Sequence, residues 1–382
     1  MISGSSALAQ FVTSRQPGDV QSNATYSTPP SNPSPRLTVS GQAVIPGHLE
    51  LLWPRQGQAE VDISDIGTLG QYGPADAPQP IASVAKTMTA YVILKDHPLA
   101  VGQQGPVIVV SAAEAGAYSA ELAAGMSLVP VRAGERLTEN QALEALMLPS
   151  ANNIAHILAR WDAGDDASFT AKMNEAANVL NMTHSNFTDP SGYSPTSVST
   201  AADLVKLGES AMVDPYFVHL VSERTAEIPV AGGVVNFNTL LGTLGVTGIK
   251  TGSTNEAGGC ILFSARVSIS GRSATLVGAV LGQDAADGKE LGLGLSVAEK
   301  LIRSAEQQLT TYTVAAAGVP VAVLAGEGDG ADLSPSSDVT VIGWPGLALH
   351  MTLSGPANSP LLKVTSPAGN ILATSTLAPP TG

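Results

Sequence analysis

The sequence contains very little of the chemistry that supports disulfide-bonded or metal-stabilised folds. Its 382 residues include one cysteine, Cys260, and six histidines spread along the chain. A single cysteine excludes an intrachain disulfide, and its apolar surroundings predict a buried thiol. The scattered histidines form no group with metal-ligand spacing, so we expect no metal site.

Positively charged residues and long apolar runs are also scarce. Lys and Arg total 18 against 32 Asp and Glu, so the formal net charge is −14 at pH 7. Nucleic acid is excluded as a partner, because no basic stretch could neutralise its phosphates. No run of about 18 apolar residues could span a membrane, and the start, Met1 to Gly4, lacks a charged segment followed by an apolar one. We therefore expect that this chain cannot export itself.

The composition is that of a globular chain with a sizeable core. Hydrophobic residues make up 44% and charged residues 13% of the chain, and the length is enough for two or more structural units. Residues 1–40 are rich in Ser, Pro, Gln and Asn and predict a flexible leader, with an extended linker at 25–35. Residues 41–310 are predicted to form the main domain. The short apolar runs between turn residues in 311–382 predict a small β-rich C-terminal domain.

The first of three short motifs with chemical meaning is Ser83-Val84-Ala85-Lys86, an SxxK tetrad. Residues i and i+3 are neighbours on one face of a helix, so Lys86 can reach Ser83 and take its proton. The residues that follow, up to Leu94, are apolar on nearly all sides and predict an enclosed helix. Burial and a second cation would lower the pKa of Lys86 and make it a base at neutral pH. The alternative is an ordinary buried helix with a capping serine.

The second motif, Ser150-Ala151-Asn152, lies at the junction of two predicted helices. Thr138 to Gln141 form a capping box that begins the first helix, and Pro149 ends it. Ser150 could relay a proton there, while Asn152 could hydrogen-bond a lysine ammonium and a substrate amide. The alternative is that both residues only cap the second helix.

The third motif, Lys250-Thr251-Gly252, lies in a predicted strand at 246–254 that two further strands follow. The lysine adds positive charge, the threonine offers a hydroxyl to a carboxylate, and the glycine lets a ligand backbone come close. The N–H of Ser253 and that of Ser83, which would open the first helix, are candidate donors to an oxyanion. The alternative is an edge strand that carries a surface lysine.

Each motif alone is weak, but the three in this order indicate one active site. With the segments around them they resemble the penicillin-binding D-alanyl-D-alanine carboxypeptidases, over roughly residues 45–308. The resemblance also rests on Gly134–Thr138, Leu148–Asn152, Phe187–Tyr193, Ser199–Leu204, and Asn236, Asn238 and Leu240 ahead of Gly248–Gly252. Many members have Gly where this chain has Ala151, and a methyl group should be tolerated there.

The resemblance implies an α+β fold, in which an antiparallel sheet flanked by helices meets an all-helical lobe and the active site lies between them. It implies a serine peptidase that removes the terminal D-alanine of peptidoglycan stem peptides through an acyl-enzyme, without a metal or organic cofactor. β-Lactams are then expected as covalent inhibitors. The implied catalytic residues are Ser83, Lys86 as general base, Ser150 as proton relay and Asn152, and the implied substrate-binding residues are Lys250, Thr251, Gly252 and Ser253.

The resemblance also implies an extracytoplasmic location, because the family's substrate lies outside the membrane; a signal or anchor upstream of this chain is expected. Three kinds of protein remain as alternatives: a DD-transpeptidase or endopeptidase, a β-lactamase, and a non-enzymatic β-lactam receptor. A β-lactamase needs an efficient deacylating base, and the sequence before Pro190 offers no convincing one, Glu175 included. His156 is interpreted as a packing or surface residue, because Lys86 already supplies the base.

Overall fold

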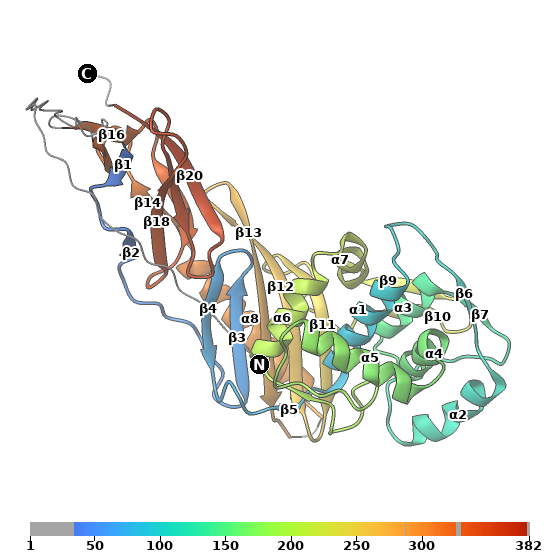
Figure 1. The fold of residues 1–382 in the computed structure, drawn as a ribbon. Coiled ribbons are helices and arrows are strands. Elements are labelled where there is room, and N and C mark those ends of the chain that lie inside the picture. Colours follow the sequence, from blue (N-terminus) through green and yellow to red (C-terminus); the bar gives the residue numbers. More distant parts are fainter. Residues whose placement is uncertain (1–33, 287, 326–329, 380–382) are drawn as a thin grey trace, which may run out of the picture.

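The computed structural model describes residues 34–286, 288–325 and 330–379. They form a five-stranded antiparallel sheet, a lobe of helices beside it and a second β-rich domain at one end of the molecule (Figure 1). The expected α+β class and the helical lobe are confirmed. The part of the expected leader and linker up to residue 33 lies outside the described residues.

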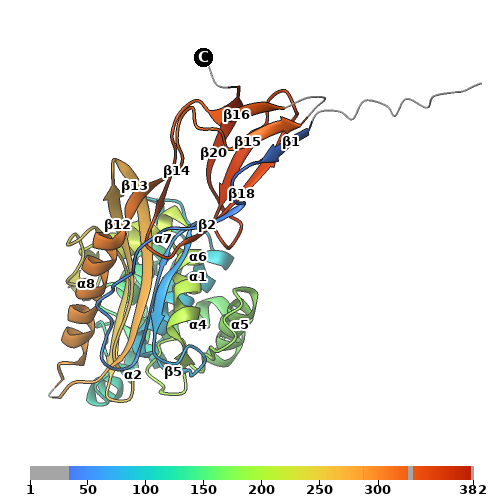
Figure 2. The same cartoon turned by 90° about the vertical axis from the view of Figure 1, so that its left-hand side faces the viewer.

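The central sheet joins the first hairpin of the main domain to its last three strands. The bounds are β3 Gln58–Ile63, β4 Gly67–Tyr72, β11 Val246–Thr254, β12 Gly258–Ile269 and β13 Arg272–Gln283, with α6 Ala201–Ala211 and α8 Glu290–Gln308 as covering helices. The strand order is β11-β12-β13-β3-β4, and each neighbouring pair is antiparallel. Helix α8 lies on one face and α6 on the other (Figure 2). Both faces of β12 and β13 are therefore covered, which explains their nearly continuous apolar sequences.

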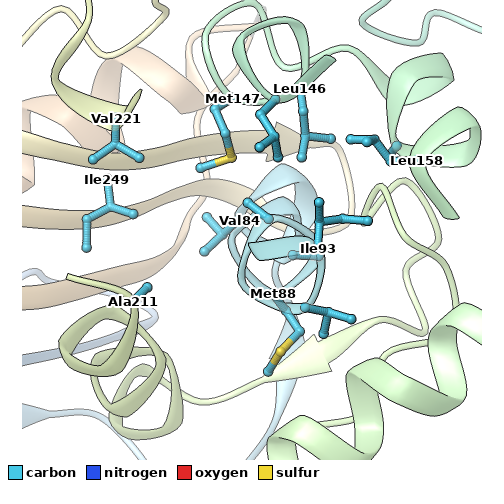
Figure 3. Packing of buried hydrophobic residues seen from close by; sticks show 14 of the residues in the cluster. Val84, Met88, Ile93, Leu146, Met147, Leu158, Ala211, Val221 and Ile249 are labelled. Carbon is cyan, nitrogen blue, oxygen red and sulfur yellow. The ribbon is translucent and has the colours of Figure 1, made fainter. Parts of the chain in front are cut away.

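The helical lobe is built around one enclosed helix. Its elements are the 3₁₀ helix η1 Ala82–Ala85, α1 Lys86–Asp96, α2 Ala112–Ala123, α3 Glu139–Met147, α4 Asn152–Ala163, α5 Asp166–Val179 and α7 Pro215–Ser222. Eight of the eleven residues of α1 are buried, as its apolar sequence predicts. Side chains of η1 and α1 share one apolar core with those of α3 and α4. Figure 3 shows Val84 and Ile93 in the middle of this core, with Leu146, Met147 and Leu158 above them and Met88 below.

The ends of α3 and α4 follow from local capping. Thr138 Oγ1 accepts a hydrogen bond from Gln141 N, and Gln141 Oε1 accepts one from Thr138 N, so the predicted capping box is confirmed. Helix α3 ends at Met147, just ahead of Pro149, and α4 begins at Asn152. The second motif is thus held between two anchored helix ends.

Short two-stranded ladders tie the loops of the lobe together. They pair β5 Gln79–Pro80 with β8 Val198–Ser199, β6 Val107–Val109 with β7 Arg136–Thr138, and β9 Thr225–Ile228 with β10 Gly232–Val235. The first ladder anchors the approach to η1, and the second anchors the approach to α3. These contacts hold the segments that carry two of the motifs.

The C-terminal domain is β-rich, as its sequence predicts. Its strands are β14 Thr310–Ala315, β15 Ala322–Ala325, β16 Ala331–Pro335, β17 Val339–Gly343, β18 Ala348–Ser354, β19 Leu361–Thr365 and β20 Ile371–Ala378. Two strands from near the start of the described chain, β1 Ser34–Leu37 and β2 Gln42–Val44, complete a sheet of order β1-β15-β16-β20-β19-β18-β2.

The position of β1 and β2 differs from the predicted boundaries. Residues 34–37 were expected in a flexible leader and residues 42–44 in the main domain, yet both pair with strands of the C-terminal domain (Figure 1). Their backbone groups hydrogen-bond to β15 and β18, and Leu37 and Ala43 pack against the same apolar core. No local sequence pattern marks such a distant partner.

No helix within the described part of the chain is long and apolar enough to cross a membrane.

Candidate active site

The first two motifs and the residue that follows the third motif contribute to the lining of one cavity of about 500 Å³; Lys86, Ser150 and the residues of the third motif itself are not among its lining residues. Ser83 of η1, Asn152 of α4 and Ser253 of β11 line it, together with Tyr193 and the segment that follows α2. A larger hollow of about 630 Å³, lined by Asp62, Glu209 and Arg266, contains none of the three motifs. The 500 Å³ cavity is therefore the candidate active site.

Ser83 was expected to open an α-helix. It lies instead in a strained 3₁₀ turn ahead of that helix. It is part of η1, and α1 begins three residues later at Lys86. The preceding Ala82 has a φ of 47°, in the left-handed region that non-glycine residues rarely adopt. Lys86 Nζ lies 2.8 Å from Ser83 Oγ, so the i, i+3 contact is present although the helix type differs.

Lys86 is completely buried and has three hydrogen-bond partners. Its Nζ donates to Ser83 Oγ, to Asn152 Oδ1 at 2.6 Å and to the carbonyl oxygen of Ser191 at 2.7 Å. Burial lowers the pKa of Lys86 well below its usual value, and the charge of Lys250 lowers it further. A neutral amine next to the serine hydroxyl can accept its proton.

The residues of the second motif take different positions. Asn152 contacts Lys86 directly, and its backbone N–H donates to the carbonyl of Ser127 at 2.7 Å. Ser150 has a φ of 64°, and its hydroxyl is buried without a hydrogen-bond partner among the described residues. The structure thus brings Asn152 into contact with Lys86 and leaves Ser150 beside the site, outside the hydrogen bonds of Lys86.

The third motif lies on β11 with its lysine and threonine buried. Lys250 and Thr251 are 2% and 3% exposed, and Lys250 Nζ donates to the carbonyl of Thr251 at 2.9 Å. Burial lowers the pKa of Lys250 to about 7. A Cβ atom on Gly252 would lie 2.7 Å from Ser83 N, so only glycine allows β11 to approach η1 this closely. Ser253 is exposed at the cavity wall.

His156 and Glu175, for which the sequence predicts no catalytic role, make their contacts elsewhere. His156 Nδ1 is 2.6 Å from Asp166 Oδ2, a contact between α4 and α5 that agrees with a packing role. Glu175 lines a separate hollow on the outer surface of α1 and α5 with Lys95. Neither lines the cavity that contains Ser83.

The segment from Asp189 to Tyr193 supplies contacts that the sequence does not predict. The carbonyl of Ser191 is a partner of Lys86, and Tyr193 Oη donates to the carbonyl of Ala124 at 2.8 Å on the cavity rim. The Asp-Pro-Ser-Gly sequence signals a turn, but it does not show which distant side chain the backbone of that turn contacts.

Among the described residues, no group of three or more His, Cys, Asp or Glu side chains could hold a metal ion.

Comparisons with known proteins agree with this geometry. The D-alanyl-D-alanine carboxypeptidase family matches residues 71–284. A curated relative, D-alanyl-D-alanine carboxypeptidase DacD of Escherichia coli (strain K12), is 30% identical over 242 residues, which are 61% of this chain and 58% of that protein. The match thus spans little more than half the length of that relative.

Solved structures extend the similarity to the fold. The crystal structure of the Streptomyces K15 DD-transpeptidase is 26% identical and covers 68% of this chain and 98% of that one, with a TM-score of 0.55. Penicillin binding protein 5 from Haemophilus influenzae, at 20% identity, shares the fold over 88% of this chain and 98% of its own, with a TM-score of 0.61. The family matches more than half of the residues, so the chain belongs to the D-alanyl-D-alanine carboxypeptidase family.

Proposed function

We propose that this chain is a serine D-alanyl-D-alanine carboxypeptidase that removes the terminal D-alanine of peptidoglycan stem peptides. The observation that carries the proposal is the 2.8 Å hydrogen bond between Lys86 Nζ and Ser83 Oγ, made by a completely buried lysine. A lysine in that environment is a base at neutral pH, and a serine beside it is an activated nucleophile. The family membership supports the same reaction class.

In the proposed reaction, neutral Lys86 takes the proton of the Ser83 hydroxyl while Oγ attacks the carbonyl carbon between the last two D-alanines. The N–H groups of Ser83 and Ser253 face the oxyanion that forms. The peptide bond then breaks as its nitrogen receives a proton from Lys86, with Ser150 as the proposed relay, and D-alanine leaves. Water adds to the acyl-enzyme and frees Ser83.

We assign substrate binding to the third motif, which lies in the buried stretch of β11. Thr251 offers a hydroxyl to the terminal carboxylate, and Lys250 attracts its negative charge. Asn152, held by Lys86, can hydrogen-bond the substrate amide. Gly252 leaves room for the substrate backbone to lie along the strand. A β-lactam presents a strained amide to the same groups, so we propose that it acylates Ser83.

Product analysis with a D-alanyl-D-alanine peptide, with and without an added amine acceptor, tests the proposal. Release of D-alanine and a shortened peptide in both cases, lost in Ser83→Ala, is the expected result. Transfer to the amine in place of hydrolysis would make the protein a transpeptidase, as the K15 structure is named. No peptide product at all, with β-lactam still bound, would make it a receptor, and rapid β-lactam turnover would make it a β-lactamase.

The location follows from the substrate. Stem peptides lie outside the cytoplasmic membrane, so we propose that the protein acts there. Membrane attachment through another segment stays a prediction.

A further inference from the structure

The segment from Asp189 to Tyr193 contacts the general base through its backbone. Lys86 Nζ donates one of its three hydrogen bonds to the carbonyl of Ser191, a residue 105 positions away that is completely buried. The other two bonds point to Ser83 and Asn152. The carbonyl of Ser191 therefore helps to decide where the lysine nitrogen lies relative to the nucleophile.

The carboxylate of Asp189 organises this segment. Its Oδ2 accepts hydrogen bonds from Ser191 N at 3.2 Å, Ser191 Oγ at 2.6 Å and Tyr193 N at 3.0 Å. Its Oδ1 accepts one from Ser197 Oγ at 2.6 Å. Four donors converge on one side chain, and two of them are backbone groups of the segment that holds Lys86.

The segment is also fixed at both ends. Thr89 Oγ1, one turn along α1 from Lys86, donates to the carbonyl of Pro190 at 2.6 Å. Gly192 has a φ of 73°, and a Cβ atom there would lie 1.9 Å from the carbonyl oxygen of Ala82. The segment is therefore pressed against the turn that carries Ser83, and its conformation and the position of the nucleophile are linked.

Charge gives a second connection to Lys86. The charged side chains that act on Lys86 are Lys250 from β11, which disfavours the protonated amine, and Asp189, which favours it. Asp189 also acts on His156, as do Asp166 and Glu121. Asp189 is thus the negative charge that opposes the effect of Lys250 on the base.

We propose that Asp189 is a positioning residue for the reaction: its carboxylate folds residues 189–193 so that the Ser191 carbonyl holds Lys86 beside Ser83, and its charge balances that of Lys250. The inference rests on the proposed function, because it assigns Asp189 a role in presenting the base. It adds a residue outside the three motifs to the machinery that they form.

The test is Asp189→Asn, with the rate of Ser83 acylation by a chromogenic β-lactam measured across pH. Asparagine keeps the size of the side chain but removes its charge and half of its acceptors. A misplaced base should lower the maximal rate by roughly 10- to 100-fold. Without the negative charge Lys86 loses its proton more readily, so the acid limb of the profile should move to lower pH. The control is Thr196→Val, which removes a hydroxyl of the same loop that does not contact Asp189. It should leave the maximal rate and the position of the acid limb unchanged.

A measurement without turnover separates this proposal from the proposed function. The chain has eight lysines, so ¹³Cε-lysine NMR can follow Lys86 directly, with its signal assigned by its loss in Lys86→Arg. The midpoint of the Lys86 titration should fall in Asp189→Asn even if no substrate is ever found. If Asp189→Asn does not fold, Asp189→Glu takes its place. The glutamate keeps the negative charge but displaces the acceptor oxygens, so it should lower the maximal acylation rate and leave the acid limb of the pH profile nearly in place. An unchanged Lys86 titration and acid limb in Asp189→Asn, or an unchanged maximal rate in Asp189→Glu, would overturn the proposal.

Discussion

Lys86 Nζ and Asn152 Oδ1 lie 2.6 Å apart, although 66 positions separate the two residues in the chain. The contact joins the start of α1 to the start of α4 and is buried from solvent. Because the amide oxygen accepts one N–H of the lysine, the nitrogen is oriented toward Ser83 before any substrate binds. The site is in this sense organised in advance, which lowers the cost of reaching the transition state.

Replacing Lys86, the proposed base, should remove activity and leave the fold intact. Lys86→Met keeps an unbranched side chain in the buried position, so packing is largely preserved. The acylation rate of Ser83 by a penicillin should fall by about 10²–10⁴, the usual contribution of a general base. Lys95→Met, an exposed lysine on the same helix, is the matched control. Near-normal acylation by a folded Lys86→Met protein would rule out the assigned role.

The second lysine should set the pH range of activity. Lys250 disfavours the protonated form of Lys86, so Lys250→Met should raise the pKa of Lys86. More of the base is then protonated at a given pH, and the acid limb of the acylation profile should move to higher pH. The shift is opposite to the one expected for Asp189→Asn. If the acid limb of the acylation profile stays in place or moves to lower pH in Lys250→Met, then the charge of Lys250 does not lower the pKa of Lys86.

Thr251 should distinguish a free carboxylate from an amide at the end of the substrate. Charge-assisted hydrogen bonds contribute roughly 1.5–3 kcal/mol, or about 10- to 150-fold in kcat/KM at 1.4 kcal/mol per decade. Amidating the terminal D-alanine should cost about that factor in the wild type. Thr251→Val should reduce the difference in kcat/KM between the free and the amidated peptide, because it affects chiefly the peptide with a free carboxylate. Equal losses on both peptides would mean that Thr251 shapes the cavity without recognising the carboxylate.

Much of the site could be predicted from sequence, because the residue types and their order carry the chemistry. The capping box at Thr138 and the turn at Pro149 placed the second motif correctly between two helix ends. The 3₁₀ turn at Ser83 was not predicted, because contact with β11 at Gly252 helps to determine it and propensity alone does not. The pairing of β1 with β15 and the role of the Ser191 carbonyl depend on backbone groups, which every residue has, so side-chain patterns could not identify them.

Glu139 shows a feature that sequence reasoning could not reveal and that affects stability. It is the first residue of α3 and is completely buried, and neither carboxyl oxygen has a hydrogen-bond partner among the described residues. Burial raises its pKa from 4.5 to about 7. The folded state therefore binds the proton more tightly than the unfolded state, and the free energy of unfolding should fall as pH rises from about 4.5 to about 7.

Urea unfolding at pH 5 and pH 8 tests this effect with Glu139→Gln. The glutamine stays neutral, so the stability advantage of the variant over the wild type should be larger at pH 8 than at pH 5 by about 1–3 kcal/mol. Glu175→Gln removes the same charge from an exposed position and should show no such pH dependence. A stability difference that is the same at both pH values would contradict the explanation.

Intact-mass spectrometry of the protein with a penicillin tests the central claim most directly, because it reports whether the three motifs form a working nucleophile. Opening of the lactam ring by Ser83 loses no atoms, so the wild type should gain the full mass of one drug molecule and retain it for a long period. Ser83→Ala should gain nothing. An adduct of equal amount in Ser83→Ala, or no adduct on the wild type, would contradict the account.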